Sequence, residues 1–434
     1  MNARVLLVVG LALSGCGGKK GMDVPDASPG LVTLTDGGTV DLTDAGIECT
    51  GPLEDLMREA LAAAPATESF YLELRRDSDA RLFRAYRTVS GKAPVTETTM
   101  LQSASTAKLI SAVVILDVIT NPQRYPGGGM VNGRALTLDS AIADFLPAGA
   151  STAWKPHTGA LASTNRLASV TLRQLLSFTS GLEKEPPCIG SLSDPDACIS
   201  DIVDLNLARN ADPAGARTFF YSGAHLFVAA RAAVNASGLG SWGALFRAFK
   251  EAHGVFQSPL TSPGPAELGV GAFFPFSGAG NSPSPAGALR YTAGDYTPFL
   301  VKLTHHEILS AAVVSQLFTD EVAAQGVAIE YSPLLDDGEA WHYDLGNWTE
   351  CPDATFTAEC AAARRYSSPG SFGTYPFVDF NPSAAGEHLF VGLLGYGGTT
   401  QGVAATSIAI YRALGGGAVG TKDLAQRWAA STCP

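Results

Sequence analysis

The chain has 434 residues, of which 46% are apolar and 16% charged, a composition typical of a folded globular protein rather than a disordered or collagen-like one. Single cores rarely grow beyond about 300 residues, so this length predicts one large two-lobed unit or two domains. The 29 lysines and arginines against 41 aspartates and glutamates give a net charge of −12, and the longest basic run is Lys19-Lys20, which argues against nucleic acid as a partner.

Residues 1–15 have the pattern of an export signal. Arg4 precedes an apolar stretch from Val5 to Leu13, far shorter than the ~20 residues that cross a bilayer. The sequence Leu13-Ser14-Gly15-Cys16 resembles the lipobox of bacterial lipoproteins, in which the signal is removed and the cysteine is acylated. The resemblance implies a lipid anchor at Cys16 that holds the protein on the bacterial cell envelope, facing the periplasm, and Gly17 favours outer-membrane sorting.

Residues 16–48 are predicted to be a flexible tether, because they are rich in Gly, Asp, Thr, Ser and Pro and contain few large apolar side chains. The folded domain is predicted to span 49–434. Export would place its six cysteines in an oxidising compartment. The simplest of the fifteen possible pairings is Cys188–Cys198, Cys351–Cys360 and Cys49–Cys433, and six buried thiols are the alternative.

The predicted elements of this domain place strands at both chain ends and helices in the middle. Leucine or methionine at three-to-four spacing predicts a helix over 53–61, and alternation predicts a hairpin of strands over 70–74 and 81–86. Residues 107–116 are apolar nearly all round and predict a buried central helix. Composition predicts further helices over 171–178, 223–236 and 240–251. It also predicts a pair of strands over 366–379 and 388–394. This order predicts an α/β layer with a mostly helical lobe, about 126–335, inserted into it.

Ser105-Thr106-Ala107-Lys108 is the only Ser-x-x-Lys in the chain, and it opens the predicted buried helix. Residues i and i+3 share a helix face, so the Lys108 amine can reach the Ser105 hydroxyl. A serine is a weak nucleophile until a base takes its proton, and a lysine can be that base only when burial or a second cation makes it neutral. The motif therefore predicts a nucleophile and base, and the alternative is a helix start with a surface lysine.

Five stretches in order resemble the penicillin-recognising serine hydrolases, which include class C β-lactamases, D-alanyl-D-alanine carboxypeptidases and related esterases. They are residues 99–108, 135–147, 171–182, 220–223 and 287–296. The resemblance covers about residues 50–415. It implies the β-lactamase/transpeptidase-like α/β fold, an antiparallel sheet flanked by helices and formed from both chain ends, with an inserted, mostly helical lobe.

By this resemblance Ser105 is the acylated nucleophile, Lys108 its base partner, and Tyr221 a phenol that shuttles protons through its oxygen. A nearby lysine ammonium is expected to lower the phenol pKa below its usual value of about 10, so that the pair can share one proton. The alternative for Tyr221 is an aromatic cap on the core. Gly223 stands where the family's Tyr-x-Asn motif has asparagine, so recognition of a peptide or lactam amide is in doubt.

The family's third motif, Lys or His followed by x-Gly on an edge strand, has no clean match. The preferred alignment is Ser368-Pro369-Gly370-Ser371, the second candidate is Gly395-Tyr396-Gly397-Gly398, and a plain turn is the alternative. In the preferred alignment the backbone N–H groups of Ser105 and Ser371 would form an oxyanion hole. Ser368 then supplies a hydroxyl but no cation, which weakens binding of a substrate carboxylate and favours esters.

These features predict a serine hydrolase that forms an acyl-enzyme on Ser105 and acts on small esters or amides. A β-lactamase or a D-Ala-D-Ala carboxypeptidase, with a peptide substrate, is the alternative within the class. A catalytically silent binding module and a structural envelope protein are alternatives outside it. No Gly-x-Ser-x-Gly occurs, which argues against the α/β-hydrolase fold. No cofactor or metal is predicted, since Cys-x-x-Cys and His-Glu-x-x-His spacings are absent and His305-His306-Glu307 has no third ligand at metal spacing.

Overall fold

A computed structural model describes most of the predicted domain in separate stretches. They are residues 69–76, 81–87, 95–154, 166–189, 194–211, 216–257, 284–335, 338–351, 355–380 and 390–396, with short pieces at 31–33, 39–41, 51–52, 55, 382–383, 386–387 and 430–431. The predicted signal peptide, Cys16 and nearly all of the predicted helix 53–61 lie outside the described residues. Inside the predicted tether, β1 (Leu31–Thr33) and β2 (Thr39–Asp41) pair antiparallel, because β-branched residues flank Asp36-Gly37-Gly38.

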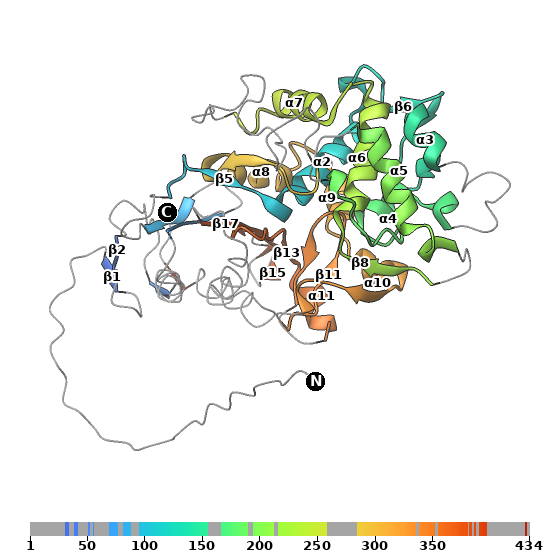
Figure 1. Cartoon of the computed structure of the whole chain (residues 1–434). Helices are drawn as coiled ribbons and strands as arrows, with labels where there is room; N and C mark the ends of the chain where they lie inside the picture. Colours follow the sequence, from blue (N-terminus) through green and yellow to red (C-terminus); the bar gives the residue numbers. More distant parts are fainter. Residues whose placement is uncertain are drawn as a thin grey trace, which may run out of the picture.

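An antiparallel sheet of seven strands joins the two ends of the chain (Figure 1). Its order is β11 (His342–Tyr343), β12 (Trp348–Thr349), β13 (Arg365–Ser367), β14 (Tyr375–Asp379), β17 (Phe390–Tyr396), β3 (Phe70–Arg76) and β4 (Arg81–Arg87). β17 lies between β14 and β3 and pairs with β3 along its whole length, from Phe390 opposite Arg76 to Tyr396 opposite Phe70. The predicted sheet from both chain ends is thus confirmed.

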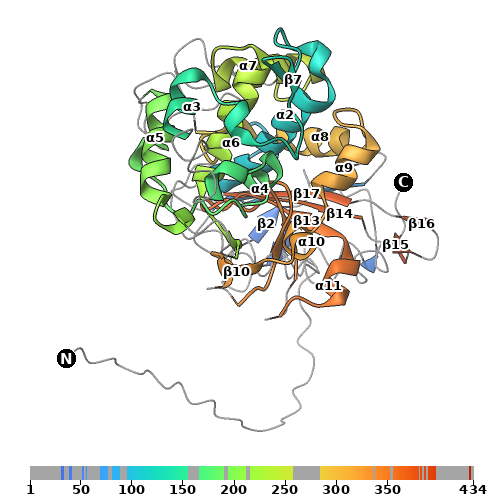
Figure 2. The same ribbon diagram turned by 90° about the vertical axis from the view of Figure 1, so that its right-hand side faces the viewer.

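The predicted central helix is α2 (Ala107–Thr120), and its residues from Ala107 to Val118 are all buried. The helices α6 (Gly223–Ser237) and α7 (Trp242–His253) pack against it, while α8 (Ala293–Thr304) packs on β3, β14 and β17. Figure 2 shows these four helices on the same side of the sheet. An apolar helix without a polar face needs such cover on every side, so α2 is fixed in the middle of the domain.

The remaining elements of the described residues are short. The helices are α3 (Ala148–Trp154), α4 (Leu172–Leu176), α5 (Pro195–Asn206), α9 (Ala311–Leu317), α10 (Glu321–Gln325) and α11 (Ala358–Ala363). The 3₁₀ turns are η1 (Ala104–Thr106), η2 (Pro122–Arg124), η3 (Ile142–Asp144), η6 (Arg166–Ser169), η7 (Pro187–Ile189) and η8 (Arg209–Ala211). Further strand pairs are β5 (Met100–Gln102) with β9 (Arg290–Thr292), β6 (Met130–Val131) with β7 (Arg134–Ala135), β8 (Thr218–Phe220) with β10 (Ala328–Tyr331), and β15 (Pro382–Ser383) with β16 (Gly386–Glu387).

The predicted strand over 366–379 is wrong in its middle. The chain forms β13, turns, and returns as β14, because Pro369 and Gly370 interrupt the strand and Gly373 adopts a positive φ of 87°. The neighbouring strand predicted over 388–394 is β17, and the helices predicted over 223–236 and 240–251 are α6 and α7, with ends that differ by a few residues.

Both local disulfides of the predicted pairing are present. Cys188 bonds Cys198 and so ties η7 to α5, with their Cα atoms 5.5 Å apart. Cys351 bonds Cys360 and ties the chain after β12 to α11, with a Cα separation of 5.0 Å. Cys49 and Cys433 lie outside the described residues, so the third bond stays a prediction.

The turn between β11 and β12 packs directly against α2. Gly346 has a positive φ of 83°, and a Cβ placed there would lie 2.6 Å from the Ala112 Cβ and 2.8 Å from the Lys108 carbonyl oxygen. We expect Gly346→Ala to lower the free energy of unfolding by at least about 3 kcal/mol, since a clash is added to backbone strain. Gly338→Ala is the matched control, because its φ is 79° with no atom within 4 Å of the new Cβ.

The control should cost only about 1 kcal/mol, from the strain of a left-handed alanine. Denaturant unfolding of the two variants measures the difference. Equal losses would show that the turn can move away from α2, contrary to this packing.

Candidate active site

The turn before α2 presents Ser105 to a surface cleft. Ser105 lies in η1, and the preceding Ala104 has a positive φ of 43°, which is strained for a residue other than glycine. Ser103 stabilises this strained turn through two hydrogen bonds. Its N–H donates to the Leu289 carbonyl at 2.9 Å, and its hydroxyl donates to the Gly287 carbonyl at 3.1 Å. The nucleophile candidate is thus fixed by a segment that lies far away in the sequence.

Lys108 lies one turn further along, in hydrogen-bond contact with the Ser105 hydroxyl. Its Nζ donates to Ser105 Oγ at 2.9 Å and to the Ala286 carbonyl at 2.8 Å, and the residue is only 5% exposed. Burial lowers the pKa of the Lys108 amine to about 8, with the carboxylate of Glu185 opposing the shift. About a tenth of this amine is therefore neutral at pH 7, far more than for a solvated lysine, and able to accept a proton from Ser105.

Tyr221 approaches the same two groups from the end of β8. Its side chain hydrogen-bonds with Ser105, and the Lys108 Nζ lies 5.0 Å from the centroid of its ring. The expected lowering of the phenol pKa is wrong: burial and the charge of Glu185 raise the Tyr221 pKa, and the hydrogen bond with Ser105 opposes them only in part. Tyr221 therefore carries its proton at neutral pH, which suits a proton donor rather than a base.

A buried histidine supports the strand end that carries Tyr221. His225 on α6 is wholly buried, and burial lowers its pKa to about 3, so its ring is neutral. Its Nε2 donates to the Phe220 carbonyl at 3.0 Å, and its Nδ1 accepts from the Ser180 hydroxyl at 2.7 Å. Its ring stacks on that of Phe178, with centroids 4.9 Å apart. The stretch 171–182 that carried part of the sequence resemblance thus packs behind Tyr221.

Gly223 leaves room for a carboxylate that the sequence did not reveal. The Gly223 N–H, at the start of α6, donates to Glu185 Oε1. A Cβ at position 223 would lie 3.1 Å from that oxygen and 3.0 Å from the Ala286 Cβ, tighter than most natural contacts. Where the family has an asparagine, this chain therefore has a glycine with the Glu185 carboxylate beside it. No spacing or motif in the sequence predicts this position of Glu185.

The preferred third-motif segment lies beside Ser105. Gly370 approaches the nucleophile turn so closely that a Cβ would stand 2.1 Å from the Ser103 carbonyl oxygen, and Thr106 Oγ1 donates to the Thr374 carbonyl at 3.2 Å. Ser368 is buried, and its hydroxyl donates to the Ser105 carbonyl at 3.4 Å. Contrary to the expected edge position, β13 lies inside the sheet, between β12 and β14.

The described part of the second candidate for this motif lies in the sheet and not among the cleft lining. Gly395 and Tyr396 pair with Tyr71 and Phe70 of β3 inside the sheet, and Gly397 and Gly398 lie outside the described residues. The cleft is instead bordered by Pro369 and Ser371. The structure thus brings Ser105, Lys108, Tyr221 and the turn at 368–371 together.

A cleft of about 460 Å³ opens over Ser105. Its other walls are largely aromatic or apolar, and they carry two carboxylates. The lining residues are Ser105, Glu183, Glu185, Phe220, Tyr221, Tyr331, Pro333, Leu334, Trp348, Pro369 and Ser371. No lysine or arginine is among these described lining residues, so the mouth of the cleft is negative apart from the Lys108 amine beneath it. The walls at 183–185, 331–334 and 348 could not be predicted, because they come from three separate segments that no motif links.

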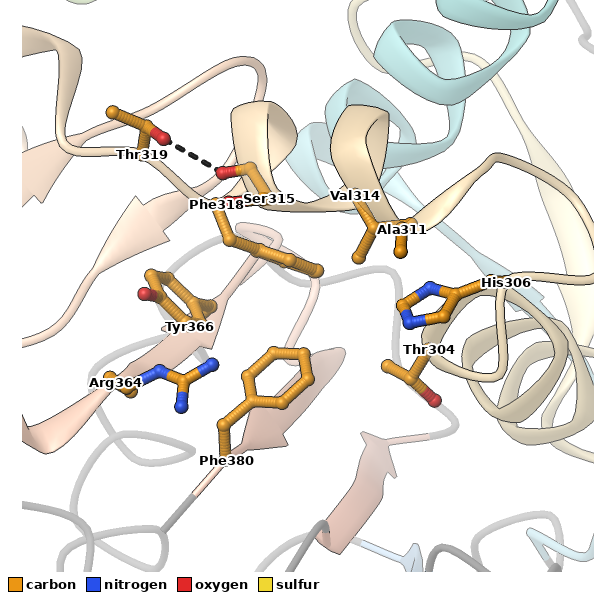
Figure 3. Close-up of a pocket in the computed structure, with 10 residues that line it drawn as sticks. All are labelled: Thr304, His306, Ala311, Val314, Ser315, Phe318, Thr319, Arg364, Tyr366 and Phe380. Atoms are coloured by element: carbon orange, nitrogen blue, oxygen red, sulfur yellow. Dashed lines mark hydrogen bonds between the residues drawn. The ribbon is translucent and has the colours of Figure 1, made fainter. Parts of the chain in front are cut away.

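A second cavity, of about 450 Å³, lies between α9 and the strands β13 and β14. Figure 3 shows Phe318, Tyr366 and Phe380 around it, with the Arg364 guanidinium, 5.1 Å from the Phe380 ring centroid, beside them. Two of its hydroxyls are engaged: Thr319 donates to the Ser315 carbonyl at 2.7 Å and Thr304 to the Leu300 carbonyl at 3.0 Å. No lysine is among its described lining residues, so the pairing of a serine with a buried lysine seen in the cleft is not repeated here.

Comparison with known proteins agrees with this geometry. The family model described as Beta-lactamase matches residues 54–385. The chain belongs to the beta-lactamase family. Its fold resembles those of a penicillin-binding protein from Bacillus halodurans and the octameric penicillin-binding protein homologue from Pyrococcus abyssi. The first is 18% identical with a TM-score of 0.51 and covers 83% of this chain and 98% of its own; the second is 15% identical with a TM-score of 0.53 and covers 84% and 77%.

The D-amino acid amidase from Ochrobactrum anthropi SV3 is a further structural relative, at 14% identity, a TM-score of 0.50 and coverage of 83% of this chain and 98% of its own. No curated protein matches the chain. At these identities the beta-lactamase fold is shared, and the reaction has to be argued from the site itself.

Other predicted features lie away from the cleft. His305 pairs with Glu307 at 3.9 Å, and both side chains and His306 are exposed at the end of α8. Within the described residues, no three His, Cys, Asp or Glu side chains gather in a way that could hold a metal ion. None of the helices in the described part of the chain is both long enough and apolar enough to cross a membrane.

Acylation of Ser105 should follow the titration of Lys108. Only the neutral amine can accept the hydroxyl proton, so labelling of Ser105 by a fluorophosphonate is expected to speed up about tenfold per pH unit and to level off above a pKa of about 8. The measurement is the pseudo-first-order rate of labelling across that range at constant ionic strength, corrected for hydrolysis of the probe without protein. A rate that ignores pH, or falls as pH rises, would contradict Lys108 as the base.

Proposed function

We propose that this member of the beta-lactamase family is a serine hydrolase that forms a covalent acyl-enzyme on Ser105. The observation that carries the proposal is the 2.9 Å contact between Lys108 Nζ and Ser105 Oγ, made by an amine whose pKa burial lowers to about 8. A nucleophile, a base that is partly neutral and a protonated phenol then meet at the floor of one cleft, which a merely structural lysine would not require.

The reaction follows from these roles. Neutral Lys108 takes the Ser105 proton while Oγ bonds to the substrate carbonyl carbon, and the carbonyl oxygen gains the negative charge. As the carbonyl re-forms, the bond to the leaving group breaks and that group takes a proton from the Tyr221 hydroxyl, which Lys108 then restores. In the second half-reaction neutral Lys108 takes a proton from the attacking water while the water oxygen bonds to the acyl carbon. As the bond from that carbon to Ser105 Oγ breaks, Oγ receives this proton back from Lys108, and the acid product is released.

The backbone N–H groups of Ser105 and Ser371 are the proposed oxyanion donors, since both residues border the cleft at the point of attack. Two fixed donors aimed at a developing negative charge contribute several kcal/mol, roughly 3 kcal/mol for each removed in other acyl-transfer enzymes. The close approach of Gly370 to Ser103 keeps the two segments together.

Small esters, and amides after them, are the proposed substrates. β-Lactams and D-Ala peptides carry a carboxylate, which needs a cation on the enzyme. At the third motif Ser368 is uncharged, and its hydroxyl already donates a hydrogen bond to the Ser105 carbonyl. The Gly223 N–H is engaged by Glu185, whose charge repels a second carboxylate. An ester needs less transition-state stabilisation from the site than an amide does, because its leaving group is easier to expel than an amine.

The test compares p-nitrophenyl butyrate with nitrocefin, a chromogenic β-lactam. We expect kcat/KM for the ester to exceed that for nitrocefin by at least about a hundredfold, since one repelled and unpaired carboxylate costs several kcal/mol. Ser105→Ala should lower ester turnover by at least about a thousandfold and abolish fluorophosphonate labelling. The control is Ser315→Ala, which removes an exposed hydroxyl on α9, away from the cleft.

Faster turnover of nitrocefin than of the ester would favour the β-lactamase alternative. A folded protein that neither reacts with fluorophosphonate nor turns over either substrate would favour the silent binding module.

A further inference from the structure

One carboxylate of the cleft is left facing the substrate space. Glu183 is paired with Arg209, which also pairs with Glu330. Glu185, in contrast, forms no ion pair with a lysine or arginine among the described residues, and its side chain is exposed within the cleft lining. It is held by the Gly223 N–H at the start of the fifteen-residue helix α6, where the helix dipole favours a negative charge.

Four aromatic side chains line the cleft together with this carboxylate. The Tyr221 ring stacks on Trp348 with centroids 5.2 Å apart, and Phe220 packs on Tyr331 at 5.0 Å. All four residues line the same cleft as Ser105 and Glu185. Aromatic rings attract a cation through their negative faces, and a carboxylate attracts it through its charge. An anion is repelled by the same two features, and a purely aliphatic group gains nothing from Glu185.

We propose that Glu185, together with the Phe220 and Tyr331 rings of the cleft, binds a positively charged, ammonium-type substituent of the substrate, so that the protein prefers cationic esters over neutral ones of the same shape. The inference rests on the proposed hydrolase activity and deepens it by naming the substrate class. Glu185 is then a specificity-determining residue, and the glycine at position 223 leaves space beside its carboxylate, since a Cβ there would lie 3.1 Å from Oε1.

A different role for Glu185 predicts a different result. Its charge acts on both Lys108 and Tyr221 and opposes the low pKa of the Lys108 amine. If Glu185 served only to tune that amine, its removal would change the hydrolysis of every ester by the same factor. A role in recognition changes the ratio between a cationic and a neutral ester, and the ratio cancels any effect on the base.

The test uses two p-nitrophenyl esters of equal shape, 4-(trimethylammonio)butanoate and its uncharged isostere 5,5-dimethylhexanoate. For the unaltered protein we expect kcat/KM for the cationic ester to exceed that for the isostere by on the order of tenfold, a size typical of a partly exposed cation site. Glu185→Gln keeps the shape and the hydrogen bond from Gly223 but removes the charge, and should bring the ratio close to one.

Glu330→Gln is the matched control. It removes one negative charge from an exposed residue that is outside the cleft lining and already paired with Arg209, so the tenfold preference should persist. A ratio near one in the unaltered protein, or a ratio that Glu185→Gln leaves unchanged, would overturn the inference. In both cases continued turnover of the neutral ester would leave the proposed hydrolase intact.

A binding measurement separates the two proposals completely. The affinity of Ser105→Ala for the methyl esters of the same two acids, measured by calorimetry, does not depend on turnover. We expect the cationic methyl ester to bind on the order of tenfold more tightly, and Glu185→Gln in the same background to remove that advantage. Equal affinities would overturn the cation site even if no ester were hydrolysed, whereas an absence of hydrolysis with the preference intact would overturn the hydrolase alone.

Discussion

The amine of Lys108 is buried within hydrogen-bond distance of the Ser105 hydroxyl, and burying it lowers the stability of the folded protein. A fall in pKa from 10.5 to about 8 corresponds to about 3 kcal/mol of unfavourable free energy whenever the buried amine is protonated. The Ala286 carbonyl offsets part of this cost by accepting a hydrogen bond. The remainder is a stability cost of the kind that reactive sites commonly carry, because a fully solvated lysine would be a poor base at neutral pH.

Two close backbone contacts hold this arrangement from different sides. Gly346 in the β11–β12 turn lies against the Lys108 carbonyl, and Gly370 after β13 lies against the Ser103 carbonyl. Neither contact has room for a Cβ. The sheet therefore fixes the start of α2 through its backbone, while the helical lobe brings Tyr221 and Glu185 over it from the other side of the cleft. This division explains why a sheet built from both chain ends and an inserted lobe are both needed for one site.

The sequence allowed the juxtaposition of Ser105, Lys108, Tyr221 and the third-motif turn to be predicted, because Ser105 and Lys108 are one helical turn apart and the other motifs follow in family order. Glu185, Trp348 and Tyr331 could not be predicted, since they reach the cleft from segments that no periodicity links. The pKa of Tyr221 was predicted in the wrong direction because burial, the largest influence on it, depends on the packed structure. The strand over 366–379 was overextended because its Pro369-Gly370 turn lies within an otherwise strand-like stretch. Lipidation of Cys16 and the Cys49–Cys433 bond stay predictions, since these residues lie outside the described part of the chain.

The central claim is that Lys108 is buried with a lowered pKa, and the most direct measurement is the pH dependence of the free energy of unfolding of the unaltered protein and of Lys108→Met. Below a pH of about 8, Lys108 is protonated in both the folded and the unfolded protein, and the folded protein bears the full free-energy cost of burying the charge. Between about 8 and 10.5 the unfolded chain binds more protons than the folded one, so the stability of the unaltered protein rises with pH relative to that of the methionine variant. We expect the difference between the two proteins to shift by about 3 kcal/mol across this window, whereas a constant difference would contradict a buried Lys108 of lowered pKa.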